Sequence, residues 1–147
     1  MSRRGGSQKL AKQTVVHMDP RLARLIADYQ ERVSDAVTML EDAGIPRPAS
    51  HLEWAAMDVP QTGSLPGGFS YFKHGIGCAV DGPPWGVDFD FREDGQIDGF
   101  NADRLHRFAR RRLVDYGFGS AEEIESAVQD AHNAGDLVFS NNYYVSR

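Results

Sequence analysis

Two aspartates separated by one residue are the clearest candidates for chemistry in this sequence. The segment Val87-Asp88-Phe89-Asp90-Phe91 alternates apolar and acidic residues, so a β-strand there would place both carboxylates on one face. Two carboxylates that close could share a divalent cation or a proton. The competing interpretation is a solvated face, because antiparallel sheets commonly expose one side to water. We favour the solvated face, with metal ligation by Asp88 and Asp90 as the alternative.

One histidine and the single cysteine lie just upstream and could take part in the same chemistry. If Tyr71 to Val80 is one strand, His74 and Cys78 share a face but lie about 13 Å apart along it, beyond direct proton transfer. His74 could instead face Asp88 or Asp90 across a hairpin and act as an acid or base there. A structural histidine is the favoured interpretation, and Cys78 is interpreted as a small buried hydrophobe.

Charged residues surround the aspartate pair in two blocks of opposite sign. The acidic block runs from Asp81 to Asp98, and the basic block on the next segment comprises Arg104, Arg107, Arg110, Arg111 and Arg112. The arginines could bind phosphates, but no aromatic residues are interleaved among them to stack bases. The net charge of -5 also opposes general attraction to nucleic acid. Nucleic-acid binding is therefore disfavoured, and a solvated helix face is the favoured interpretation.

Three segments have the signals of helices that could position these residues. Asp19-Pro20 begins a long helix with an apolar stripe that ends at Gly44. Asn101 can cap a helix from Ala102 to about Tyr116, stopped by Gly117. Ser120 and Glu123 form a capping box before a third helix that ends at Gly135.

The remaining pattern predicts strands joined by turns. Tyr71–Val80 and Val87–Phe91 are expected to pair across the turn residues 81–84, and Ile97–Phe100 to follow as a third strand. Residues 47–70 are expected to form a loop-rich connector with one helical turn near 51–57. A final strand is expected at 137–145, split at Asn141-Asn142. The sequence predicts an α+β fold, with an antiparallel meander sheet packed against a long N-terminal helix and two C-terminal helices.

Length and composition favour one domain at 18–147, preceded by a flexible basic arm at 1–17. The chain has 147 residues, 41% apolar and 25% charged, which is ordinary globular usage. One cysteine cannot form an intramolecular disulfide, which fits a reducing compartment. No apolar run reaches the length of a membrane helix or a signal peptide. We therefore expect a bacterial cytoplasmic protein that has no membrane partner; no cofactor is indicated, and the sequence does not reveal the oligomeric state.

The stretch from Tyr71 to Phe108, with its motifs YFKHGIGCAV, VDFDF and DGQIDGFNADRLHRF, resembles a family of bacterial domains of unknown function associated with polymorphic toxin and immunity loci. The resemblance covers about a quarter of the chain and assigns no catalytic residue. It implies an immunity-type protein that binds and neutralises a cognate toxin, and the acidic balance suits a basic partner.

On this hypothesis the acidic segment from Asp81 to Asp98 docks onto the toxin, with Trp85 as an aromatic anchor. The candidate partner-binding residues are Asp81, Trp85, Asp88, Asp90, Glu93, Asp94 and Asp98. The first alternative is a small metal-dependent hydrolase, in which Asp88 and Asp90 hold a cation and His74 moves the proton. The second is a nucleic-acid-binding module that uses the arginine-rich helix.

Overall fold

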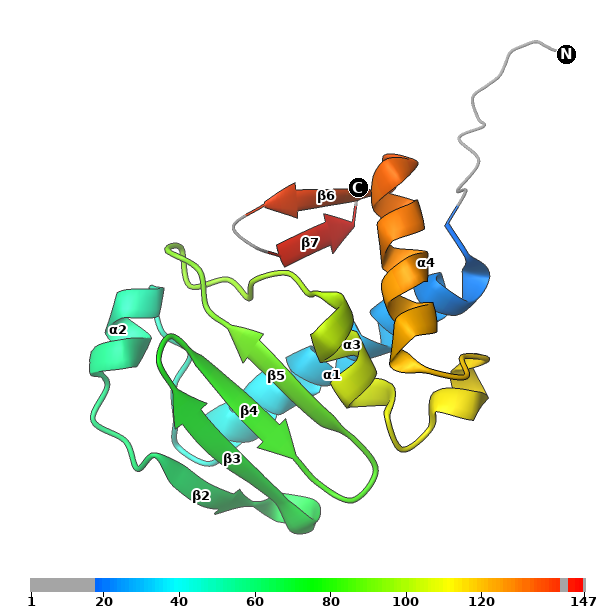
Figure 1. Ribbon diagram of the computed structural model, residues 1–147. Coiled ribbons are helices and arrows are strands. Elements are labelled where there is room, and N and C mark those ends of the chain that lie inside the picture. Colours follow the sequence, from blue (N-terminus) through cyan, green and yellow to red (C-terminus); the bar gives the residue numbers. More distant parts are fainter. Residues whose placement is uncertain (1–17, 141–142, 147) are drawn as a thin grey trace, which may run out of the picture.

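The computed structural model describes residues 18–140 and 143–146. The basic arm expected at 1–17 lies outside these residues. The described elements follow one another along the chain as α1 (Pro20–Asp42), α2 (His51–Ala56), β2 (Thr62–Leu65), β3 (Phe69–His74), β4 (Gly77–Asp81), β5 (Gly86–Asp90), α3 (Ala102–Ala109), α4 (Ala121–Asn133), β6 (Leu137–Ser140) and β7 (Tyr143–Ser146) (Figure 1). Short 3₁₀ turns lie at Pro66–Gly68 and Leu113–Tyr116.

Helix α1 begins and ends where the sequence predicted. The Asp19 carboxylate accepts a hydrogen bond from the backbone N–H of Arg21, and Pro20 takes the first helical position. The helix is followed by Gly44, whose φ of 91° lies in the left-handed region. Its apolar stripe is buried along its whole length, at Leu22, Leu25, Ile26, Tyr29, Val33, Ala36, Val37 and Leu40.

Four antiparallel strands form one sheet in the order β2-β3-β4-β5. Tyr71, Val80 and Val87 face one another in register and are all buried, together with Cys78 and Phe89 from the same face. This inner face packs against α1, which crosses behind the sheet, while α3 and α4 lie together beyond its β5 side (Figure 1). The α+β fold with a meander sheet, a long N-terminal helix and C-terminal helices is confirmed.

The structure corrects three strand predictions. Tyr71–Val80 is not one strand but a hairpin, because the chain reverses at Gly75, whose φ of 47° favours glycine. The connector expected at 47–70 contributes a strand of its own, β2, beside the expected helical turn α2. Ile97–Phe100 is not a strand of the sheet, because its two ends pair with different partners. Isolated bridges join Ile97 to Phe91 and Phe100 to Tyr144 of β7, and between them the Asp98 N–H donates to the Asp90 carbonyl at 2.8 Å.

The helix expected from Ala102 to Tyr116 is also divided. Helix α3 starts at the expected cap, since the Asn101 side chain accepts from the Arg104 N–H, but it ends at Ala109 and the chain tightens into a 3₁₀ turn before Gly117. The predicted capping serine of α4 is confirmed, with Ser120 accepting from the Glu123 N–H. The final strand pair β6-β7 forms a separate two-stranded sheet. Among the helices of the described ranges, none combines the length and the apolarity needed to cross a membrane.

Candidate functional site

The outer face of the sheet carries the aspartates of β4 and β5. Asp88 lies opposite Ala79 and Asp90 lies opposite Gly77 in the β4–β5 register, so both side chains leave the sheet on the side away from α1. The prediction that they share a face is confirmed by this register. β5 is the last strand of its sheet, and α3 packs beside it. The arginines of α3 therefore reach the outer-face carboxylates directly.

Asp88 is held between a histidine and an arginine. Its Oδ1 lies 2.7 Å from His74 Nε2, and its Oδ2 lies 3.4 Å from Arg107 Nη1. The turn at Gly75 makes this contact possible, because it folds β3 alongside β4 and brings His74 near the last strand. The side chain of Asp88 is 17% exposed and that of His74 is 33% exposed. The predicted contact between His74 and one of the paired aspartates is therefore present.

Asp90 lies in the most enclosed charged cluster of the outer face. The Tyr143 hydroxyl donates a hydrogen bond of 2.7 Å to Asp90 Oδ2, and Arg104 Nη2 lies 3.2 Å from the same oxygen. The Arg104 guanidinium also stacks over the Tyr143 ring at 4.4 Å. Burial, followed by the hydrogen bond to Asp90, raises the pKa of Tyr143 to about 12. A Cβ at Gly77 would collide with the Asp90 side chain, so glycine leaves the room that this carboxylate occupies.

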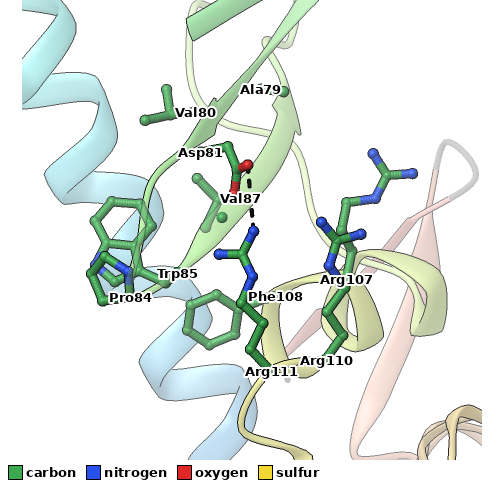
Figure 2. A pocket seen from close by; sticks show the side chains of 11 residues that line it. Ala79, Val80, Asp81, Pro84, Trp85, Val87, Arg107, Phe108, Arg110 and Arg111 are labelled. Atoms are coloured by element: carbon green, nitrogen blue, oxygen red, sulfur yellow. Dashed lines mark ion pairs between the residues drawn. The ribbon is translucent and has the colours of Figure 1, made fainter. Parts of the chain in front are cut away.

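Asp81 and Trp85 lie at the other end of β5. The Asp81 carboxylate lies 3.6 Å from Arg111 Nη2, and both side chains are about half exposed. Trp85 is half-buried, and its ring centroid lies 4.6 Å from that of Phe69. A pocket lies between the β4–β5 hairpin and α3 and is here called the arginine pocket. It is bordered by Asp81, Trp85, Arg107 and Arg111 (Figure 2).

The acids after β5 are placed differently, because they lie on a turn that α3 does not cover. Glu93 and Asp94 are exposed, and Asp98 is half-buried. With Asp90 and Tyr143 they line an open hollow of about 520 Å³, here called the acidic depression, which also includes His51, Ile76, Phe91 and Arg92. Asp94 accepts from the Gln96 N–H at 3.0 Å and is 4.0 Å from Arg92 Nε. Glu93 makes no hydrogen bond or ion pair through its side chain within the described part of the chain.

The metal-dependent alternative depends on Asp88 and Asp90 acting as a ligand pair. Each carboxylate is already bound by an arginine, Arg107 or Arg104, which a divalent cation would have to displace. In residues 18–140 and 143–146, no group of three or more His, Cys, Asp or Glu side chains is placed to hold a metal ion. The donor set therefore fits a catalytic metal poorly.

Cys78 does not face His74, contrary to the expectation from a single strand. The hairpin puts Lys73 opposite Cys78 and His74 opposite Gly77, so the thiol lies on the inner face and the imidazole on the outer face. Cys78 is completely buried, and this burial raises the pKa of its thiol to about 12. A thiol with so high a pKa is a poor nucleophile, which agrees with the interpretation of Cys78 as a buried hydrophobe.

Comparison with known protein families identifies the domain. The model of a domain of unknown function, DUF6896, matches residues 22–145, which is most of the chain. The chain belongs to the DUF6896 family. No curated protein and no solved structure matches it. The DUF6896 match spans the sheet, α3 and the acidic turn, so every candidate residue described above lies inside the family domain.

Sequence reasoning missed two residues of this DUF6896 site. Arg104 was counted among the outward arginines, but it is only 8% exposed and pairs with Asp90. Tyr143 lies far along the chain, and it reaches Asp90 because the Phe100–Tyr144 bridge fastens β7 beside the segment that follows β5. The one available signal for Arg104 was its place three residues after the Asn101 cap, next to the inward-facing Leu105.

Proposed function

We propose that this DUF6896 domain is an immunity-type binding protein that engages a basic toxin through the acidic depression. The observation that carries the proposal is the contrast in charge pairing on the two sides of Asp90. Asp81, Asp88 and Asp90 are each within 3.6 Å of an arginine nitrogen, whereas Glu93 has no such neighbour among the residues described. Glu93 is therefore still available to a partner, and beside it Asp94 has only a long, exposed pair with Arg92 at 4.0 Å.

The surroundings of the turn suit a protein partner. Ile76 lines the acidic depression and is 36% exposed, which supplies an apolar contact among the charges. Protein interfaces combine an apolar centre with a polar and charged rim. Trp85, the expected anchor, lies before β5 while the acidic turn follows it, so the two would contact different parts of a partner.

The charge of the depression supports association with a basic protein more than with a neutral one. Acidic residues in an open hollow raise the rate at which a positively charged partner arrives, and the effect weakens as salt screens it. The chain as a whole carries a net charge of -5, which acts in the same direction. Loops that join rigid elements are also common positions for binding residues.

A two-step experiment tests the proposal. The tagged chain is used to capture partners from extracts of cells that naturally produce it, and captured proteins are identified by mass spectrometry at low and at high salt. We expect one stoichiometric basic protein that is released by salt. That protein is then expressed alone and together with the chain. Growth inhibition by the partner alone, relieved by the wild type and not by a Glu93→Gln, Asp94→Asn variant, is the expected result.

Two outcomes would count against the proposal. A captured partner that does not inhibit growth would show a binding protein of another kind. Equal protection by the wild type and the double variant would show that the acidic depression is not the binding surface. A Glu122→Gln, Glu125→Gln variant removes the same charge from exposed positions on α4 and is the matched control.

A further inference from the structure

The arginine pocket has a floor of core residues and a wall, Trp85, on the connection between β4 and β5. It has a volume of about 210 Å³ and lies between the β4–β5 hairpin and α3 (Figure 2). Its floor comprises Val80, Val87 and Phe108, all of them buried core residues. Trp85 forms a side wall and is supported from behind by Phe69. The floor of the pocket is therefore fixed by the same packing that holds the domain together.

Three guanidinium groups border this apolar floor. Arg107 comes from α3, and Arg110 and Arg111 follow directly after the helix ends. Arg111 reaches toward Asp81, and Arg107 and Arg110 lie on the side of it away from Trp85 (Figure 2). Arg111 is held in place, because its Nη1 donates a 2.8 Å hydrogen bond to the carbonyl of Gly82. A donor that is already oriented loses less entropy when it binds an anion.

Positive charge exceeds negative charge around the pocket. Asp81 is the one acidic residue among those that line it. Its carboxylate forms an exposed ion pair with Arg111 at 3.6 Å. Arg107 is partly neutralised by Asp88 at 3.4 Å and by Asp103 at 3.7 Å. Arg110 is exposed and makes no hydrogen bond, ion pair or ring contact with any described residue. The guanidinium of Arg110, at the mouth of the pocket, thus has no partner among the described residues, in a chain whose net charge is -5.

We propose that the arginine pocket binds a small phosphate monoester, with the phosphoryl group on Arg110 and Arg111 and the organic part against Trp85 and the apolar floor. A phosphate dianion has several acceptor oxygens and is matched by more than one guanidinium fork. Exchanging the Asp81 contact of Arg111 for a contact with the ligand costs little, because exposed ion pairs contribute little free energy.

The size of the pocket selects a small ligand. Its volume of about 210 Å³ is below the roughly 300–1000 Å³ of sites that hold drug-sized ligands. Single-stranded nucleic acid needs a basic groove with successive aromatic platforms, whereas the residues that line this pocket include two aromatics, the half-buried Trp85 and the buried Phe108. A monomeric ester suits this arrangement better than a polymer. The pocket is separate from the acidic depression, so this inference does not depend on the proposed function.

Titration with phenyl phosphate tests the inference, with inorganic phosphate as the second arm and chloride used to keep ionic strength constant. Binding is followed by NMR at the indole N–H of Trp85 and at the arginine Nε–H groups. We expect saturation with a Kd of about 1 mM or below for phenyl phosphate, and weaker binding of inorganic phosphate. Arg110→Gln and Arg111→Gln should each weaken binding by about tenfold.

The matched control is Arg32→Gln, which removes an arginine paired with Asp35 on α1. Its affinity should equal that of the wild type. Three results would overturn the inference: no saturable shift at Trp85, equal weakening by Arg32→Gln and Arg110→Gln, or tighter binding of a short oligothymidylate that Arg110→Gln leaves unchanged. Thermal melts of all three variants establish that each remains folded, so a loss of binding reports on the pocket.

Discussion

Two groups of acidic residues are neighbours in the chain but differ in burial and in pairing. One group lies on β5, and the other lies on the turn that follows it. Asp88 and Asp90 point from a strand that packs beside α3, and arginines of that helix neutralise them. Glu93 and Asp94 lie on the next turn, where they remain exposed. The same residue type therefore supports the fold in one region and stays available to a partner in the other.

This difference follows from how much hydration each carboxylate loses when the chain folds. An acid that is largely withdrawn from water needs a cation and hydrogen bonds to offset its desolvation. Asp90 has both, from Arg104 and Tyr143. An exposed acid such as Glu93 keeps its hydration, so evolution can change it without loss of stability or retain it for binding.

Breaking the enclosed pair should have the largest effect. Arg104→Gln leaves Asp90 without its cation in a poorly hydrated site, and we expect the free energy of unfolding to fall by about 3 kcal/mol. Urea unfolding followed by circular dichroism measures the loss. Adding Asp90→Asn to this variant should restore part of the stability. If the free energy of unfolding falls by less than about 1 kcal/mol, the pair of Arg104 and Asp90 is hydrated, and the acids of β5 are no more buried energetically than those of the turn.

The hydroxyl of Tyr143 gives a pH test of the same cluster. Its pKa is raised from the ordinary value near 10 to about 12 by burial and by Asp90, so the folded state holds the phenolic proton more tightly than the unfolded state. This contribution to stability is complete below pH 10 and is lost as the pH rises towards 12. Asp90→Asn should lower the pKa of Tyr143 in an NMR titration. An unchanged pKa of Tyr143 in that variant would show that Asp90 does not contribute to raising it.

The contact between His74 and Asp88 should contribute less, because both side chains are partly exposed. We expect His74→Ala to lower the free energy of unfolding by about 1 kcal/mol, measured by urea unfolding at pH 7. Asp88→Asn with His74→Ala should cost little more than the single change, since the two residues share one interaction. Fully additive losses would contradict the 2.7 Å contact as an energetic pair.

The exposed pair of Asp81 with Arg111 should contribute least among the paired acids. Asp81→Asn should change the free energy of unfolding by no more than about 0.5 kcal/mol, seen as a nearly unchanged thermal midpoint. A loss as large as that of Arg104→Gln would show that pairing, rather than burial, determines which acids stabilise the fold.

Local signals were sufficient for α1, for α4, for the start of α3 and for the shared face of the aspartates. Asp19 with Pro20, Ser120 with Glu123, and the alternation around Phe89 each express a preference that tertiary packing then keeps. The hairpin at Gly75 was hidden, because residues on both sides of the turn keep a strand-like alternation. Before the turn the buried residue is the odd-numbered Tyr71, and after it the buried residues are the even-numbered Cys78 and Val80. The sequence alone does not reveal this change of face, because Phe72 and His74 also alternate with Cys78 and Val80 as in one continuous strand.

The pairing of the acids could not be read from the sequence, because it depends on which helix lies beside β5. Arg104 and Arg107 are far enough from Asp88 and Asp90 in the chain that no local spacing rule connects them. Tyr143 is further still and arrives through the bridge between Phe100 and Tyr144. Charge patterning therefore located the candidate residues, while the tertiary structure decided which of them are already bound.

The most direct test of the central claim is the association rate of the captured basic partner with three forms of the chain. These are the wild type, Glu93→Gln with Asp94→Asn, and the α4 control Glu122→Gln with Glu125→Gln, measured by surface plasmon resonance at low and physiological salt. We predict that the acidic-turn variant associates about tenfold more slowly at low salt, while the α4 control keeps the wild-type rate. Equal rates for the two double variants would contradict the claim that the exposed acids of the turn form the binding surface.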